Sequence, residues 1–78
     1  MVMWYRKEQK LDSKEAAQQS IKDGIAVRAV DSDGVICADL QKRGDAILVS
    51  FRDKETFDIR EVCFIDGVTA TDWVERRN

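Results

Sequence analysis

Short apolar segments separated by turn residues occur at nearly even spacing along residues 25–68. Within each segment, apolar residues tend to occupy every second position, which is the period of a β-strand with one buried face. Residues 31–34 have the composition of a turn, because Asp and Ser hydrogen-bond nearby backbone and Gly34 tolerates a positive φ. The pattern therefore predicts a curled antiparallel sheet.

Four predicted strands agree on one buried face. The turn at residues 31–34, a connection at residues 41–46 around Gly44 and a tight loop at residues 53–55 set the expected register. The expected cross-strand pairs are Ile25 with Leu40, Val27 with Ala38, Ala29 with Ile36, Leu40 with Ile47, Ala38 with Val49, Ile36 with Phe51, Phe51 with Phe57, and Val49 with Ile59. A wrong strand assignment would not be expected to give such agreement.

The opposite face of this sheet is only partly polar, since Val30, Val35, Cys37 and Leu48 fall on it. Part of it must be covered, either by curling of the sheet into a small barrel or by the chain ends. The barrel is favoured by residues 59–67, which fit a strand that breaks for about one turn. The chain then resumes as a fifth short strand at residues 63–65.

A helix, a four-strand meander, a one-turn break and a closing strand over roughly residues 12–66 resemble SH3-like and Sm-like small barrels. Within that group, the size and layout are similar to bacterial Rho-binding antiterminator proteins, which are small acidic proteins that bind a transcription factor rather than RNA. The resemblance implies a mainly β fold with short helices. In that fold an N-terminal helix precedes a five-stranded antiparallel barrel, and a short helix ends the chain.

The whole chain, residues 1–78, is expected to form one small domain. It divides into an N-terminal arm (1–11), a helix (12–23), the barrel (25–66) and a C-terminal segment (69–78). Asp12 and Glu15 suggest a capping box at the start of the first helix, and Gly24 suits its end. Residues 69–72 can cap a last helix from about Ala70 to Arg76.

The charge distribution weakens the case for a nucleic-acid partner. Residues 1–30 carry six basic and four acidic side chains, and residues 31–78 carry seven and eleven, so the formal net charge is -2. A barrel that grips phosphates needs clustered Lys and Arg. With 44% hydrophobic residues, the chain has the composition of a folded domain.

Nothing in the sequence indicates catalysis, a metal site or a cofactor. Histidine is absent, Cys37 and Cys63 are 26 positions apart, and none of the four glycines belongs to a phosphate-binding loop. Because no secretory signal or membrane-length apolar run occurs, we expect a cytoplasmic protein with reduced thiols and no membrane role. The sequence therefore predicts that the chain is not an enzyme.

Two functional hypotheses remain. The first is a non-catalytic protein-binding or regulatory module, acting on a nucleic-acid-processing protein, whose acidic loops and partly apolar outer face dock on a basic partner. The second is a nucleic-acid-binding small barrel, with oligomerisation through an edge strand as an option. The acidic set is Asp31, Asp33, Asp39 and Asp45, and the nucleic-acid set is Arg28, Lys42, Arg43 and Arg52.

Trp4 has two interpretations, and the second of them makes it part of the protein-binding hypothesis. It either plugs the uncovered side of the sheet or serves as an aromatic anchor for the partner, since Trp and Tyr dominate interface energetics. Trp73 is expected to pack near Trp4 and so to tie the two chain ends together.

Overall fold

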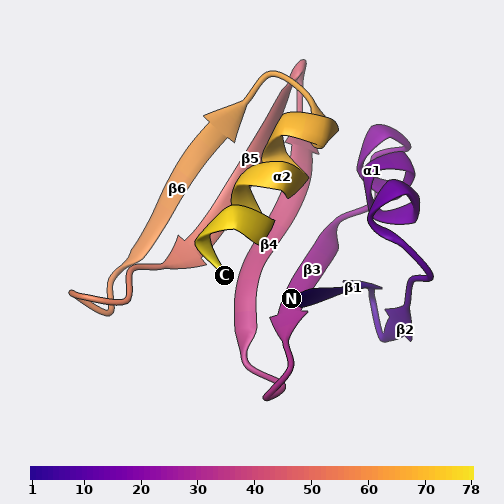
Figure 1. Ribbon diagram of the computed structural model, residues 1–78. Coiled ribbons are helices and arrows are strands. Elements are labelled where there is room, and N and C mark those ends of the chain that lie inside the picture. Colours follow the sequence, from indigo (N-terminus) through magenta and orange to yellow (C-terminus); the bar gives the residue numbers. More distant parts are fainter.

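Six antiparallel strands form one sheet, and two helices cover one of its faces (Figure 1). The computed structural model describes all residues from Met1 to Asn78. In chain order the elements are β1 (Val2–Arg6), β2 (Gln9–Lys10), α1 (Lys14–Lys22), β3 (Val27–Asp31), β4 (Ile36–Arg43), β5 (Ala46–Arg52), β6 (Ile59–Phe64) and α2 (Gly67–Arg77). The order across the sheet is β2-β1-β3-β4-β5-β6.

The sheet is open, so the predicted closure into a small barrel is wrong, whereas the mainly β character with short helices is confirmed. Strands β2 and β6 lie at opposite edges and do not pair with each other. The expected N-terminal helix in fact follows two strands, because the arm at residues 1–11 joins the sheet as β1 and β2. Both helices pack on the same face and fill the core there, so closure of the sheet is not needed to bury it.

The core lies between the helices and the covered face of the sheet. It combines alternate residues of the strands with small and aliphatic residues of both helices. Its members are Val2, Trp4, Ala17, Ile21, Val27, Ala29, Ala38, Leu40, Ile47, Val49, Ala70 and Val74. The two helices are also joined at the surface, where Lys14 Nζ lies 2.8 Å from Asp72 and 2.9 Å from Glu75. These two carboxylates raise the pKa of Lys14.

The first two hairpins keep the predicted buried face but shift the register by two residues. Val27 lies opposite Leu40, and Ala29 opposite Ala38. The β4–β5 turn is a two-residue turn at residues 44–45 rather than a six-residue connection, with Gly44 at φ 60. Because side chains alternate with a period of two, a two-residue shift leaves each side chain on its face.

Ile36 departs from the predicted face. The register of β3 and β4 shifts between Ala29 and Val30, so that Ile36 lies opposite Val30. Val30 belongs to the face that the helices leave open, and Ile36 is 49% exposed. The extra residue of such a bulge breaks the alternation of a strand, which explains why the period-two prediction fails here.

The third hairpin differs most from the prediction. Residues 53–58 form a loop, and β6 then runs without a break opposite β5, with Val49 facing Val62 and Ile47 facing Phe64. Ile59 therefore lies opposite Arg52 on the open face, and Phe57 belongs to the loop. The predictions that these two residues face inward, and that the chain breaks before a fifth strand, are wrong.

Both helices begin at a capping residue other than the one predicted from the sequence. The Ser13 side chain accepts a hydrogen bond from the amide of Ala16, in the role predicted for Asp12. Asp66 accepts from the amide and the hydroxyl of Thr69, so α2 begins at Gly67 rather than near Ala70. These bonds lower the pKa of Asp66. An oxygen acceptor before the first turn stabilises a helix because the first amides lack partners within it.

Candidate functional site

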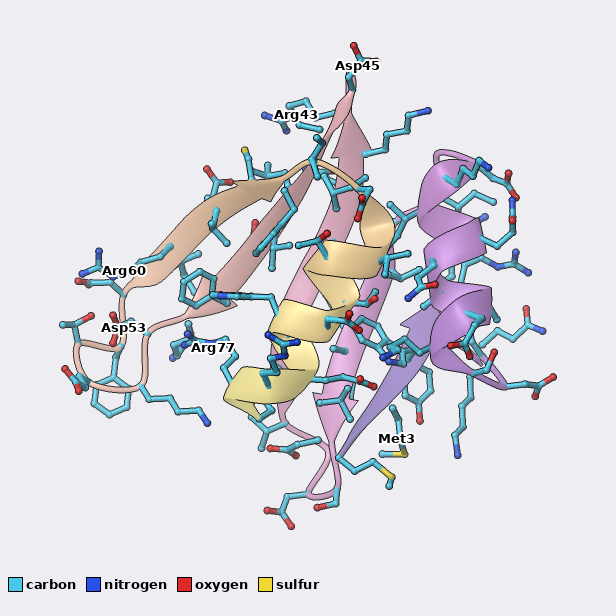
Figure 2. All side chains as sticks on the ribbon, turned by 45° about the horizontal axis from the view of Figure 1, so that its top comes forward. Met3, Arg43, Asp45, Asp53, Arg60 and Arg77 are labelled. Carbon is cyan, nitrogen blue, oxygen red and sulfur yellow. The ribbon has the colours of Figure 1, made fainter.

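The acidic residues predicted to bind a partner do not form one surface. Asp31 accepts hydrogen bonds from the amides of Asp33 and Val35, each at 2.9 Å, and so shapes the β3–β4 turn. Asp45 lies at the opposite end of the sheet, at the tip of the β4–β5 turn (Figure 2). Asp39 is paired on the open face with Arg28, with Oδ1 2.8 Å from Nε. The structure therefore brings Asp31 and Asp33 together and leaves the other two apart.

The four basic candidates are dispersed as well. Lys42 and Arg43 lie beside the β4–β5 turn, whereas Arg52 ends β5 at the other end of the sheet. The hydrogen bond from Arg28 to Asp39 raises the pKa of Arg28, and this pairing offsets its charge. No continuous basic strip connects these residues.

Trp4 is a core residue. Only 3% of it is exposed, and it joins the cluster beneath the helices. This is the first of its two interpretations, so Trp4 offers no anchor to a partner. Trp73 does not pack on it as expected but on Phe51 and Phe64, with ring centroids 5.0 and 5.4 Å away.

An exposed apolar cluster lies at the end of the sheet opposite the β4–β5 turn. The β3–β4 turn and the β5–β6 loop both lie at this end (Figure 1). Two hollows meet there, of about 480 and 200 Å³, and both are lined by Val35, Ile36 and Arg52. Ile59 lines the first and Phe57 the second. We call the surface formed by Val35, Ile36, Phe57 and Ile59 the apolar groove.

Phe57 is the most exposed member of the apolar groove, at 70%. Its φ of 63 lies in the left-handed region, which a bulky side chain rarely adopts. The loop holds it there through backbone bonds between Phe57 and Asp53 and between Asp53 and Asp58, each 2.8 Å long. An aromatic ring kept in solvent by a strained backbone is a reason to suspect a functional contact.

Asp53 fastens the loop that presents Phe57. Its carboxylate accepts from the amides of Glu55 at 2.9 Å and Thr56 at 3.3 Å, and these bonds lower the pKa of Asp53. Its other oxygen lies 3.0 Å from Arg60 Nε, and Figure 2 shows the two side chains next to each other. The loop is thus fixed before any partner arrives, which reduces the entropy lost on binding.

The groove has a basic rim. Arg52 and Lys54 border it, together with Arg77 from the end of α2. None of the four ion pairs in the structure uses these three side chains. The Arg77 guanidinium carbon instead lies 4.4 Å from the ring centroid of Phe51 and 4.8 Å from that of Trp73. Of the two carboxylates that line the hollows, Asp39 pairs with Arg28, whereas Asp31 keeps its charge while it accepts two turn amides. The three basic side chains of the rim therefore outnumber the one carboxylate without a cationic partner.

One thiol, that of Cys37, is among the residues that line the two hollows of the apolar groove. Cys37 is half-buried beside the apolar groove, and burial raises the pKa of its thiol. A raised pKa favours the protonated thiol, which is less nucleophilic than the thiolate. Cys37 and Cys63 are free and lie on β4 and β6, with β5 between them. No three His, Cys, Asp or Glu side chains are close enough together to hold a metal ion. Neither helix is both long and apolar enough to span a bilayer.

Comparison with models of known protein families, with curated proteins and with solved structures found no match. The resemblance to Rho-binding antiterminator proteins therefore stays a prediction, as does the expectation of a nucleic-acid-processing partner.

The apolar groove could not be predicted by alternation, which puts most of its members on the other face of the sheet. Ile36, Phe57 and Ile59 were expected on the buried face, and Val35 alone was expected outside it. One signal was present: Asp53 followed by polar residues is typical of a turn in which the carboxylate accepts amides further along the chain. That signal would have lengthened the predicted loop and placed Phe57 within it.

Proposed function

We propose that this chain is a non-catalytic protein-binding module and that the apolar groove receives its partner. The observation that carries the proposal is Phe57, which is held in solvent at a positive φ beside Val35 and Ile36. Aromatic side chains at the centre of an apolar patch supply much of the binding energy in protein interfaces. The strained backbone at Phe57 costs folding free energy and leaves the ring in solvent, so binding explains this conformation and folding does not.

The partner segment is acidic and apolar. Its apolar side chains occupy the groove, and its carboxylates face the rim of Arg52, Lys54 and Arg77. Such complementarity acts mainly on the association rate and on partner choice. This charge preference is the reverse of the one inferred from the sequence, because three basic side chains line the groove against one carboxylate, Asp31, that has no cationic partner.

A protein partner fits the groove better than single-stranded nucleic acid does. Bases stack on aromatic rings, and Phe57 is the one aromatic side chain of the groove, whereas the other three members are aliphatic. The remaining basic candidates, Arg28, Lys42 and Arg43, lie outside its lining or are already paired. A strand of nucleic acid would therefore find few phosphate contacts beyond the rim.

We expect Phe57→Asn to remove partner binding without unfolding the protein. Peptides are first selected from a displayed random library on the immobilised protein, and their affinity is then measured by fluorescence anisotropy. Asn tolerates the left-handed region better than Phe does, so the free energy of unfolding stays equal or rises by up to about 1 kcal/mol. Peptide affinity falls at least about tenfold, the loss expected for an interface anchor.

Val68→Asn is the matched control, because Val68 is also exposed but lies at the start of α2, outside the apolar groove. It should leave peptide affinity unchanged. Selected peptides that bind the Phe57→Asn protein as tightly as the unmodified protein would refute the proposal. So would preferential binding of a single-stranded oligonucleotide that weakens steeply with salt, which would favour the nucleic-acid hypothesis instead.

A further inference from the structure

The smaller hollow of the apolar groove, of about 200 Å³, is lined by three cations that come from three different elements. Arg52 ends β5, Lys54 lies in the β5–β6 loop, and Arg77 lies in the last turn of α2. None of them forms an ion pair within the chain. Cations without partners that line one hollow favour an anion as its occupant.

Arg77 is held in place without losing its hydrogen-bond donors. Its guanidinium carbon lies over the rings of Phe51 and Trp73, and contact with ring faces orients a guanidinium while its N–H groups stay available. The carbonyls at the end of α2 have other donors, because Asn78 donates hydrogen bonds to two of them. The guanidinium can therefore present its N–H groups to a ligand.

The side chains that line this hollow match a doubly charged anion. Asp31 is the one carboxylate among them, so three positive charges and one negative charge leave a net charge of +2. The Cys37 thiol adds no charge, because burial raises its pKa. A phosphate monoester carries a charge of about −1.5 to −2 at neutral pH, whereas a carboxylate or a phosphodiester carries a single negative charge.

We propose that this hollow receives a phosphorylated side chain of the partner segment, with the phosphate bound by Arg52, Lys54 and Arg77. The proposal rests on the proposed function and names the acidic group that the rim prefers. A phosphate offers three strong acceptor oxygens, so it can accept from cations on several sides at once, whereas the two oxygens of a carboxylate lie in one plane. Phosphorylation of the partner therefore strengthens its binding.

Phenyl phosphate and benzenesulfonate test the site without a peptide. Both carry three terminal oxygens on a phenyl group, but only the phosphate becomes a dianion. Each is titrated into isotope-labelled protein, and the Nε–H signals of Arg52 and Arg77 are followed by nuclear magnetic resonance. At neutral pH we expect phenyl phosphate to bind at least about fivefold more tightly. This advantage should shrink below about pH 6, where the phosphate gains a proton, and the chain has no histidine that would titrate there.

Arg77→Gln should remove the advantage of phenyl phosphate, whereas Arg76→Gln, the matched control, should preserve it. Arg76 lies in the same last turn of α2 and carries the same charge, but it does not line the hollow. Lys54→Gln should reduce the advantage as well, and this exposed loop residue can be replaced without loss of packing. Equal binding of the two ligands, or shifts centred on Lys42 and Arg43, would overturn the phosphate site.

Synthetic versions of a peptide selected on the protein extend the test to the partner segment. Versions with phosphoserine, glutamate or serine at one acidic position are compared by fluorescence anisotropy. We expect the phosphoserine version to bind at least about tenfold more tightly than the glutamate version. If all versions bind equally and lose affinity in Phe57→Asn, the phosphate proposal fails and the proposed function stands. If Phe57→Asn leaves peptide binding unchanged while phenyl phosphate binds as expected, the proposed function fails and the phosphate site stands.

Discussion

Replacing Trp4 with alanine should destabilise the domain by about 3–5 kcal/mol, the usual cost of truncating a buried tryptophan. Trp4 lies in β1 opposite Ala29 of β3, and its ring fills the core beneath the helices. A domain of this length has a total stability of about 4–12 kcal/mol. The substitution should therefore bring much of the population close to unfolding, as measured by urea denaturation followed by circular dichroism.

Met3→Ala provides the matched control for Trp4→Ala. Met3 is the preceding residue of the same strand, lies opposite Val30, and points to the open face. Its replacement should change the free energy of unfolding by less than about 1 kcal/mol. If the two variants lose the same free energy of unfolding, or if Trp4→Ala loses none, residues 1–6 form an arm outside the core.

Leu40→Ala should cost about 2–5 kcal/mol, whereas Ile36→Ala should cost less than about 1 kcal/mol. Both residues lie in β4, and simple alternation places both on the buried face. The shift between Ala29 and Val30 separates them, leaving Leu40 in the core and Ile36 half-exposed in the apolar groove. Urea denaturation of both variants compares them directly.

Comparable losses for these two variants would show that β4 alternates regularly and that Ile36 faces the core. In that case the apolar groove would lose one of its four members. Val49→Ala serves as a further reference, because Val49 lies opposite Leu40 and is fully buried.

The buried face of the central strands could be predicted from the sequence because it depends on a local property. Val27, Ala38, Leu40 and Val49 each have a polar residue on at least one side and recur with a period of two along their strands, and this period survives a two-residue error in register. The helix after Ser13 was likewise predictable, since an oxygen-bearing cap and Gly24 at φ 84 mark its two ends.

The open sheet could not be predicted in the same way, because it depends on contacts between distant residues. Strand β1 pairs with β3, and Leu11 donates its amide to the Trp4 carbonyl at 2.8 Å. Nothing local in residues 1–6 distinguishes a strand of the sheet from a free apolar arm. Once β1 occupies that edge, the sheet extends on the β3 side instead of closing.

The apolar groove depends on two irregularities that alternation cannot reveal. One is the bulge beside Ala29, and the other is the positive φ of Phe57, which the hydrogen bonds of Asp53 hold in place. The acidic and basic candidates failed to gather for a simpler reason. Asp31 lies at the β3–β4 turn and Asp45 at the β4–β5 turn, and consecutive turns of an antiparallel sheet lie at its opposite ends.

The most direct test of a partner site at the apolar groove is a nuclear magnetic resonance titration of isotope-labelled protein with a peptide selected on it. We expect the shifted amide signals to concentrate in residues 34–37 and 52–59, and the Arg52 and Lys54 side chains to respond to acidic peptide positions. Shifts centred instead on α1 or on the β4–β5 turn, with Phe57 unaffected, would contradict a partner site at the apolar groove.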